Sequence, residues 1–195
     1  KSLNEKFGDL SYRKYFEYNK ELQDEINNFL KIKLEKEGIK NKKRIGLGDL
    51  EVFKSPKLFI RQSAKEIISS ISFEPAAANN SLYCLSDKQN VESQEKLKVC
   101  CAQLNSTIST FYALTRRIIR VSRGKQPQIK VSDLKKIRLT FDESITRELL
   151  EITNNILSNN VERSVGISQI DEILFNYYDL SEDDINFIYK HIDTY

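Results

Sequence analysis

The sequence contains no tryptophan, no methionine and a single histidine, His191, among its 195 residues. A Ser-His or Cys-His catalytic pair needs a histidine beside the nucleophile, and this one lies in an acidic stretch, so hydrolytic triads are excluded. Of the three cysteines, Cys100 and Cys101 are adjacent and Cys84 stands alone, which gives neither a disulfide framework nor zinc-ligand spacing. We therefore expect no catalytic residue and no metal ligand in this chain, and cysteines buried as small hydrophobic residues.

Long apolar runs are missing as well. No stretch approaches the roughly 18 consecutive apolar residues of a membrane-spanning helix, and the amino end lacks the apolar core of a signal peptide. These absences predict a cytoplasmic protein without a membrane partner. Because the chain opens on Lys1 and holds no methionine, we expect a piece of a longer protein, although natural processing would leave the same ends.

Nucleotide-binding loops are not indicated either. Gly46 and Gly48 form a Gly-x-Gly pair, but a third glycine and a preceding strand are missing, so the pair predicts a turn. No lysine follows a phosphate-binding glycine loop, so a nucleotide triphosphatase is unsupported. The acidic groups Asp171-Glu172 and 182–184 are expected at helix starts, where carboxylates interact favourably with the helix dipole, rather than at a cation site.

What the sequence does have is an uneven charge. Residues 1–53 hold 12 Lys and Arg against 10 Asp and Glu, net +2. Residues 54–141 hold 16 against 6, net +10, and residues 142–195 hold 3 against 12, net −9. The net charge of +3 therefore hides a basic middle and an acidic tail.

The basic charge is densest in residues 116–138, where nine Lys and Arg face only Asp133, a net +8 over 23 residues. Such a patch binds a polyanion like DNA by releasing condensed counterions, which predicts steeply salt-dependent binding. A solvated surface that pairs with the acidic tail is the alternative explanation. Charge alone does not decide between the two.

Hydrophobic periodicity predicts the main elements. Apolar residues at helical spacing predict one or two helices over 4–36, a helix over 93–114, and C-terminal helices on the stripes Ile145, Leu149, Ile152, Ile156 and Ile170, Ile173, Leu174, Tyr177. A final helix should open at a capping box of Ser181 and Asp184. Short β-branched runs predict strands at 57–62, 67–73, 82–85 and 137–141. Gly124 and Pro127 interrupt helical continuation, so 116–128 is expected to cross the surface as a loop, where functional residues concentrate.

Four local patterns occur in order along the chain, and together they resemble a known family. They are Phe53-Lys54-Ser55-Pro56-Lys57-Leu58-Phe59-Ile60-Arg61-Gln62, Leu104-Asn105-Ser106 with Phe111-Tyr112, Gly124-Lys125-Gln126-Pro127-Gln128-Ile129 followed by Asp133-Leu134-Lys135-Lys136-Ile137, and Ile170-Asp171-Glu172-Ile173 with Tyr177-Tyr178-Asp179-Leu180-Ser181. Over residues 50–190 the chain resembles the TaqI-like C-terminal specificity domain of adenine-specific DNA methyltransferases and fused restriction-methylation enzymes. Family members carry a proline in the last strand, which Arg138-Leu139-Thr140-Phe141 lacks.

The resemblance implies an α+β fold, in which a small mixed β-sheet packs against a core amphipathic helix between helical ends. Residues 1–48 would be a helical connector from a missing catalytic part, residues 49–141 the target recognition domain, and residues 142–195 an acidic helical tail. The implied partners are double-stranded DNA and the catalytic domain of the same polypeptide. That domain would use S-adenosylmethionine, whereas this chain has no cofactor and lacks the motifs that hold a flipped adenine, the methyl donor or a nuclease metal.

Base-reading side chains are predicted from hydrogen-bonding chemistry, since Arg pairs with guanine O6 and N7 and Gln with adenine N6 and N7. The candidates are Arg61, Gln62, Arg120, Arg123, Gln126 and Gln128. Phosphate contacts are predicted for Arg116, Arg117, Lys125 and Lys130. Two alternatives stay open: a domain of a type I specificity subunit, which shares the third pattern, and a protein-interaction module whose basic patch docks an acidic partner.

Overall fold

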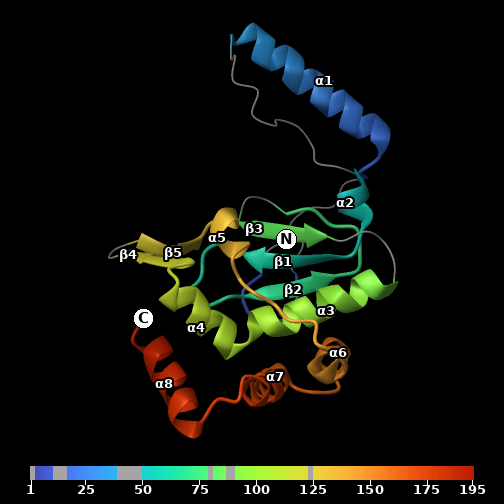
Figure 1. Ribbon diagram of the computed structural model, residues 1–195. Helices are drawn as coiled ribbons and strands as arrows, with labels where there is room; N and C mark the ends of the chain where they lie inside the picture. Colours follow the sequence, from blue (N-terminus) through green and yellow to red (C-terminus); the bar gives the residue numbers. More distant parts are fainter. Residues whose placement is uncertain (1–2, 11–16, 39–49, 79–80, 87–90, 123–124) are drawn as a thin grey trace.

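The computed structural model describes residues 3–10, 17–38, 50–78, 81–86, 91–122 and 125–195 (Figure 1). The helices are α1 (Lys20–Lys36), α2 (Leu50–Lys54), α3 (Val91–Asn105), α4 (Thr107–Thr115), α5 (Val131–Leu134), α6 (Glu143–Leu157), α7 (Arg163–Tyr177) and α8 (Glu182–Asp193). The strands are β1 (Lys57–Arg61), β2 (Ser69–Ser72), β3 (Leu82–Ser86), β4 (Ile119–Ser122) and β5 (Lys125–Ile129). Helices and small sheets together confirm the predicted α+β class.

Strands β1, β2 and β3 form one sheet in the order β2-β1-β3, and β4 and β5 form a hairpin. Every pairing in the described part of the chain is antiparallel, whereas we had expected a mixed sheet. The central strand β1 is buried on both faces, so Leu58 and Ile60 enter the main core while Phe59 enters a smaller cluster with Leu3 and Ile68. That double burial explains the continuous apolar run in its sequence.

The helix predicted over 93–114 is two helices. Helix α3 ends at Asn105, and Ser106 has an extended backbone and caps α4 by accepting a hydrogen bond from the Ser109 amide at 3.1 Å. The buried Asn105 side chain accepts from the Ser69 amide at 2.8 Å and donates to the Ser69 carbonyl at 3.0 Å. The break therefore anchors the end of α3 to strand β2.

The prediction of a strand over 137–141 is wrong, because these residues belong to neither sheet of the described structure. The backbone of Thr140 instead bonds the buried side chain of Gln103. Its amide donates to Gln103 Oε1 at 2.9 Å, and its carbonyl accepts from Gln103 Nε2 at 2.6 Å. One glutamine thus satisfies the groups that a neighbouring strand would otherwise pair.

The amino-terminal helix is shorter than predicted. Residues 3–10 are not helical, because Leu3 and Phe7 are buried in the core and the Phe7 amide donates to the Ser69 carbonyl at 2.9 Å. Residues 11–16 lie outside the described structure, and α1 begins after the N-cap Asn19. Figure 1 shows α1 projecting from the body, and it contains no buried residue.

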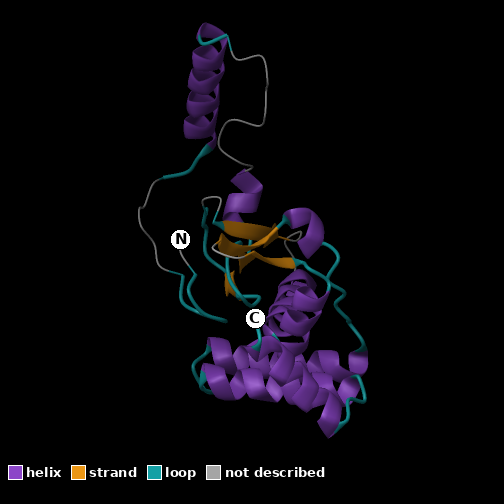
Figure 2. Ribbon diagram, turned by 90° about the vertical axis from the view of Figure 1, so that its left-hand side faces the viewer, coloured by secondary structure: helices purple, strands orange, loops and turns teal. Residues whose placement is uncertain are grey.

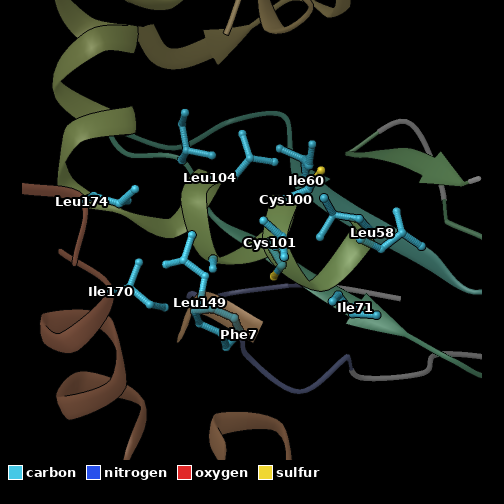
Figure 3. Packing of buried hydrophobic residues seen from close by; sticks show 14 of the residues in the cluster. Phe7, Leu58, Ile60, Ile71, Cys100, Cys101, Leu104, Leu149, Ile170 and Leu174 are labelled. Carbon is cyan, nitrogen blue, oxygen red and sulfur yellow. The ribbon is translucent and has the colours of Figure 1, made fainter. Parts of the chain in front are cut away.

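The three C-terminal helices form the third layer, with α3 and α4 between them and the sheet (Figures 1 and 2). Their predicted stripes are confirmed, since Ile145, Leu149, Ile170 and Leu174 belong to the same core as Leu58 and Ile60 (Figure 3). The acidic tail is therefore part of the folding unit.

Two acidic groups behave differently from each other. The capping box of Ser181 and Asp184 opens α8 as predicted. Asp171 does not start a helix but lies within α7, where its carboxylate accepts from the amide and hydroxyl of Thr107 at 2.7 and 2.5 Å. It caps α4 across the helix interface, and burial raises its pKa.

None of the described helices is long and apolar enough to span a membrane. Cys100 and Cys101 are buried as predicted, and burial raises the pKa of the Cys101 thiol to about 12. Cys84 is exposed, against the prediction. Within the described residues no His, Cys, Asp and Glu cluster could hold a metal ion.

Candidate nucleic-acid interface

Two of the predicted phosphate-binding residues lie where α4 ends. Arg116 is the C-cap, and Arg117 follows with a positive φ of 53°. The Arg117 amide donates to the Leu114 carbonyl at 3.0 Å, and the Ile118 amide donates to the Ala113 carbonyl at 2.8 Å. This is the Schellman pattern, in which the residue after the cap is usually glycine because left-handed backbone strains other residues.

The same pattern ends α6 and α7, with Asn159 at φ 57° and Asp179 at φ 51° in the left-handed position. Short polar side chains such as Asn and Asp tolerate that conformation, whereas arginine does not favour it. An exposed arginine is thus held in a strained conformation beside a second one, Arg116. Such strain is a pointer to function.

The segment after Arg117 forms the β4–β5 hairpin, where the sequence had predicted a loop. Ile119 pairs with Ile129, both buried, and Arg120 pairs with Gln128, both exposed. Arg120 and Gln128 therefore lie on one exposed face, which we call the outer face of the hairpin. A third predicted base-reading residue, Gln126, is exposed on the same strand as Gln128.

Proline 127 shapes the hairpin. Lacking an amide hydrogen, Pro127 cannot take a regular place in a ladder. The register shifts here, since Arg120 pairs with Gln128 but Ser122 pairs with Lys125, and β5 therefore carries one extra residue in the stretch that contains Pro127. Such irregularities increase the local twist of a hairpin and re-aim its side chains.

Arg120 is held in place by the next element. Its Nη2 atom lies 2.5 Å from Oδ2 of Asp133 in α5, and Lys136 Nζ lies 2.8 Å from Oδ1 of the same carboxylate. The Asp133 side chain is only 8% exposed. The hydrogen bonds from Lys136 and Arg120 lower the pKa of Asp133, so the carboxylate stays charged and orients Arg120.

Ile129 joins the hairpin to the three-stranded sheet. The Ile129 amide donates to the Gln62 carbonyl at 2.9 Å, and the Tyr83 hydroxyl donates to the Ile129 carbonyl at 2.7 Å. We call these two hydrogen bonds the Ile129 junction. The junction brings Gln62, at the end of β1, beside Gln128, which is 66 positions further along the sequence.

The remaining candidates are distributed around this hairpin. Lys130 is exposed and opens α5. Arg116 is exposed, with its guanidinium carbon 5.7 Å from the Tyr112 ring centroid. Arg61 lines a cleft of about 510 Å³ that also includes Asp193 and Tyr195 at the end of α8. Two candidates cannot be placed: Arg123 and the side chain of Lys125 lie outside the described structure.

The acidic tail packs beside the basic segment without forming ion pairs to it in the described part of the chain. Among the described residues, no salt bridge joins 116–138 to 142–195, and the acid that pairs with Arg120 is Asp133. The tail packs through apolar side chains, with Leu149 and Leu174 in the core. Near Arg61, the end of the tail lines the same cleft as this predicted base-reading residue.

Residues 8–139, more than half of the chain, match the family described as the TaqI-like C-terminal specificity domain. The chain belongs to this family. Membership indicates DNA sequence recognition in a restriction-modification enzyme, and with it DNA binding and a fused catalytic part. No curated protein matches the chain. The match begins at residue 8, inside residues 1–48, which were predicted as a helical connector. The division of the chain into connector, recognition domain and tail therefore stays a prediction.

The structure separates structural from exposed residues in this TaqI-like domain. Lys57, in the first of the four patterns, is fully buried, and its Nζ atom donates to the Phe53 carbonyl at 2.7 Å near the end of α2. Burial lowers its pKa. Lys57 therefore ties α2 to the sheet and is not available to DNA.

Sequence reasoning missed the hairpin and the role of Tyr83. The alternation of Ile119-Arg120-Val121-Ser122 was a usable signal for β4. The contact between Tyr83 and Ile129 joins residues 46 positions apart, and no local pattern marks it.

Proposed function

We propose that this TaqI-like domain recognises a sequence in double-stranded DNA by placing the outer face of the β4–β5 hairpin in the major groove. The carrying observation is that Arg120 and Gln128 pair across the hairpin on one exposed face, with Gln126 also exposed on β5. The major groove is wide enough for a two-stranded β-ribbon, and it presents the acceptors and donors that Arg and Gln read. Arg116, Arg117 and Lys130 flank this face with positive charge and would hold phosphates.

Arg120 has a shared role in this proposal. The bond from its Nη2 atom to Asp133 fixes the plane of the guanidinium. Arginine carries five N–H donors, so the others can face guanine or a phosphate. Gln62 would extend the reading face at the Ile129 junction, and Arg61, Arg123 and Lys125 would add contacts at its edges.

For the fused catalytic part we propose an adenine-N6 DNA methyltransferase in a bacterial cytoplasm, with or without an endonuclease on the same polypeptide. Such an enzyme would turn the target adenine out of the duplex. S-adenosylmethionine would bind in that part, and no residue of this chain is assigned to it. The proposal is supported by the four ordered sequence patterns and by the family match.

The first experiment is a salt titration of binding to duplex DNA, measured by fluorescence anisotropy. Each phosphate contact should contribute a slope of about −0.9 to the plot of log K against log salt. A set of several contacts therefore predicts a steep loss of affinity between 50 and 200 mM salt, which are typical test concentrations. A flat response would refute the proposal.

The second experiment separates base reading from phosphate binding. Duplexes enriched from a random library by the wild-type chain serve as the specific probe, and scrambled duplexes as the nonspecific one. Gln128→Ala should weaken binding to the enriched duplex alone, by about 1–3 kcal/mol. Lys130→Ala should weaken both and reduce the salt slope by about 1. Lys190→Ala is the matched control, because it replaces a lysine in the tail helix α8. It should change neither the affinity for the two duplexes nor the salt slope. Equal losses for both duplexes from Gln128→Ala and Lys130→Ala would refute this division of roles.

A further inference from the structure

The Ile129 junction fixes the hairpin at the point where it meets the sheet. Both backbone polar groups of Ile129 are used there, the amide by the Gln62 carbonyl and the carbonyl by the Tyr83 hydroxyl. The Ile129 side chain is 1% exposed, and the Tyr83 ring packs against the same core. Side chain and backbone of this one residue are thus both held by the body of the domain.

A two-stranded hairpin has little stability of its own in water, so its orientation depends on such attachments. At the other strand of this hairpin, Ile118 and Ile119 are buried at 1% and 2% exposure. Buried isoleucines hold the hairpin against the core, but they do not set its orientation, because apolar contacts have no preferred angle. Hydrogen bonds do have one. The two bonds at Ile129 therefore fix the direction in which β5 leaves the sheet, while β4 is held by the bond from the Ile118 amide to the Ala113 carbonyl at the end of α4.

That direction matters for recognition, since base-reading side chains must be held to within about 0.5 Å of their working geometry by the groups behind them. Gln128 is adjacent in sequence to Ile129, and Gln62 supplies the accepting carbonyl. A rotation of the hairpin at Ile129 would move Gln128 and Gln126 relative to Gln62. Phosphate contacts tolerate such a shift better, because long flexible lysine and arginine side chains can follow the backbone of the DNA.

We propose that Tyr83 is a positioning residue for DNA sequence recognition, which acts by holding Ile129 and so the outer face of the hairpin. The inference rests on the proposed function. Tyr83 itself lies on β3 and touches the hairpin through its hydroxyl group. Removing that hydroxyl leaves the half-buried ring in place against the core, so the change is confined to the junction.

The test compares the wild-type chain with Tyr83→Phe and with Tyr178→Phe, which removes a tyrosine hydroxyl from the end of α7. Affinity is measured for the library-enriched duplex and for a scrambled duplex, each across a salt series. Hydrogen exchange of the Ile129 amide is followed by NMR in the protein without DNA. We expect Tyr83→Phe to lower the ratio of the two affinities at least about fivefold, the lower bound for one base contact. Its affinity for the scrambled duplex and its salt slope should stay unchanged, and its Ile129 amide should exchange faster.

Three other results would overturn the inference. An unchanged affinity ratio in Tyr83→Phe would show that the hydroxyl does not position the hairpin. Equal loss of affinity for both duplexes, or the same loss in Tyr178→Phe, would show a general effect on the fold. Failure of the wild-type chain to bind DNA, or to discriminate the two duplexes, would refute the proposed function itself. The wild-type measurement comes first, so this failure is distinguished from a failure of the inference about Tyr83.

Discussion

Replacing Arg117 by glycine should weaken DNA binding while leaving the fold at least as stable as before. Arg117 holds a φ of 53° at the end of α4, a conformation that costs an ordinary residue roughly 1–2 kcal/mol. Glycine removes that strain but loses about 0.5–1 kcal/mol more through its greater freedom in the unfolded chain. The free energy of unfolding should therefore change by about 0 to +1.5 kcal/mol.

Binding should change in the opposite direction. One phosphate contact contributes a salt slope of about 0.9, which corresponds to roughly an eightfold loss of affinity at a salt concentration of about 0.1 M. The assay is a salt titration by fluorescence anisotropy, combined with urea unfolding of the same samples. Asn159→Gly is the matched control, since Asn159 occupies the same position after α6 at φ 57° and carries no charge.

The reasoning would be refuted if Arg117→Gly bound DNA as tightly as the wild-type chain. It would equally fail if the variant lost stability, because the loss of affinity would then follow from the fold. If Asn159→Gly lost affinity for DNA, the effect would belong to the backbone and not to the arginine side chain.

Three further changes test the fold. Gly166→Ala should destabilise the chain by about 1–3 kcal/mol in urea unfolding, because a Cβ there would lie 2.4 Å from Ile156 Cγ1. Asp184→Asn should destabilise it at neutral pH, measured by thermal unfolding, because hydrogen bonds from Ser181 hold the pKa of Asp184 below its ordinary value. In the wild-type chain this stabilisation should disappear as the pH falls through that lowered pKa. Deleting 142–195 should abolish cooperative unfolding followed by circular dichroism, because Leu149 belongs to the main core; a truncated chain that folds would contradict this.

The sequence was informative wherever one segment carried its own pattern. Strand β1 was predictable because an apolar run of strand length follows Pro56, and the C-terminal helices because Ile145, Leu149 and Ile156 recur at helical spacing. The charge pattern also pointed to residues 116–138. In each case the signal comes from local periodicity or composition, which tertiary contacts did not override.

The errors have a different physical origin, because they depend on contacts between distant segments. Phe7 lies at helical spacing, yet it is drawn into the core beside Ser69. The strand expected around Thr140 is replaced by the side chain of Gln103. The outer face of the hairpin exists because two strands rich in Arg and Gln pair with each other, and such residues give a weak strand signal.

The anchoring of the hairpin suggests how recognition can change during evolution. The base of the hairpin is fixed by a pair of buried isoleucines, Ile119 on β4 and Ile129 on β5, whereas Arg120, Gln126 and Gln128 are exposed. Exposed substitutions of this kind alter stability little. Under the proposed function, Arg120, Gln126 and Gln128 are therefore the positions at which new combinations of side chains can be sampled without redesigning the body that carries them. Exchanging these side chains would then be a shorter route to a new target sequence than exchanging the whole domain, whose core continues into the C-terminal helices.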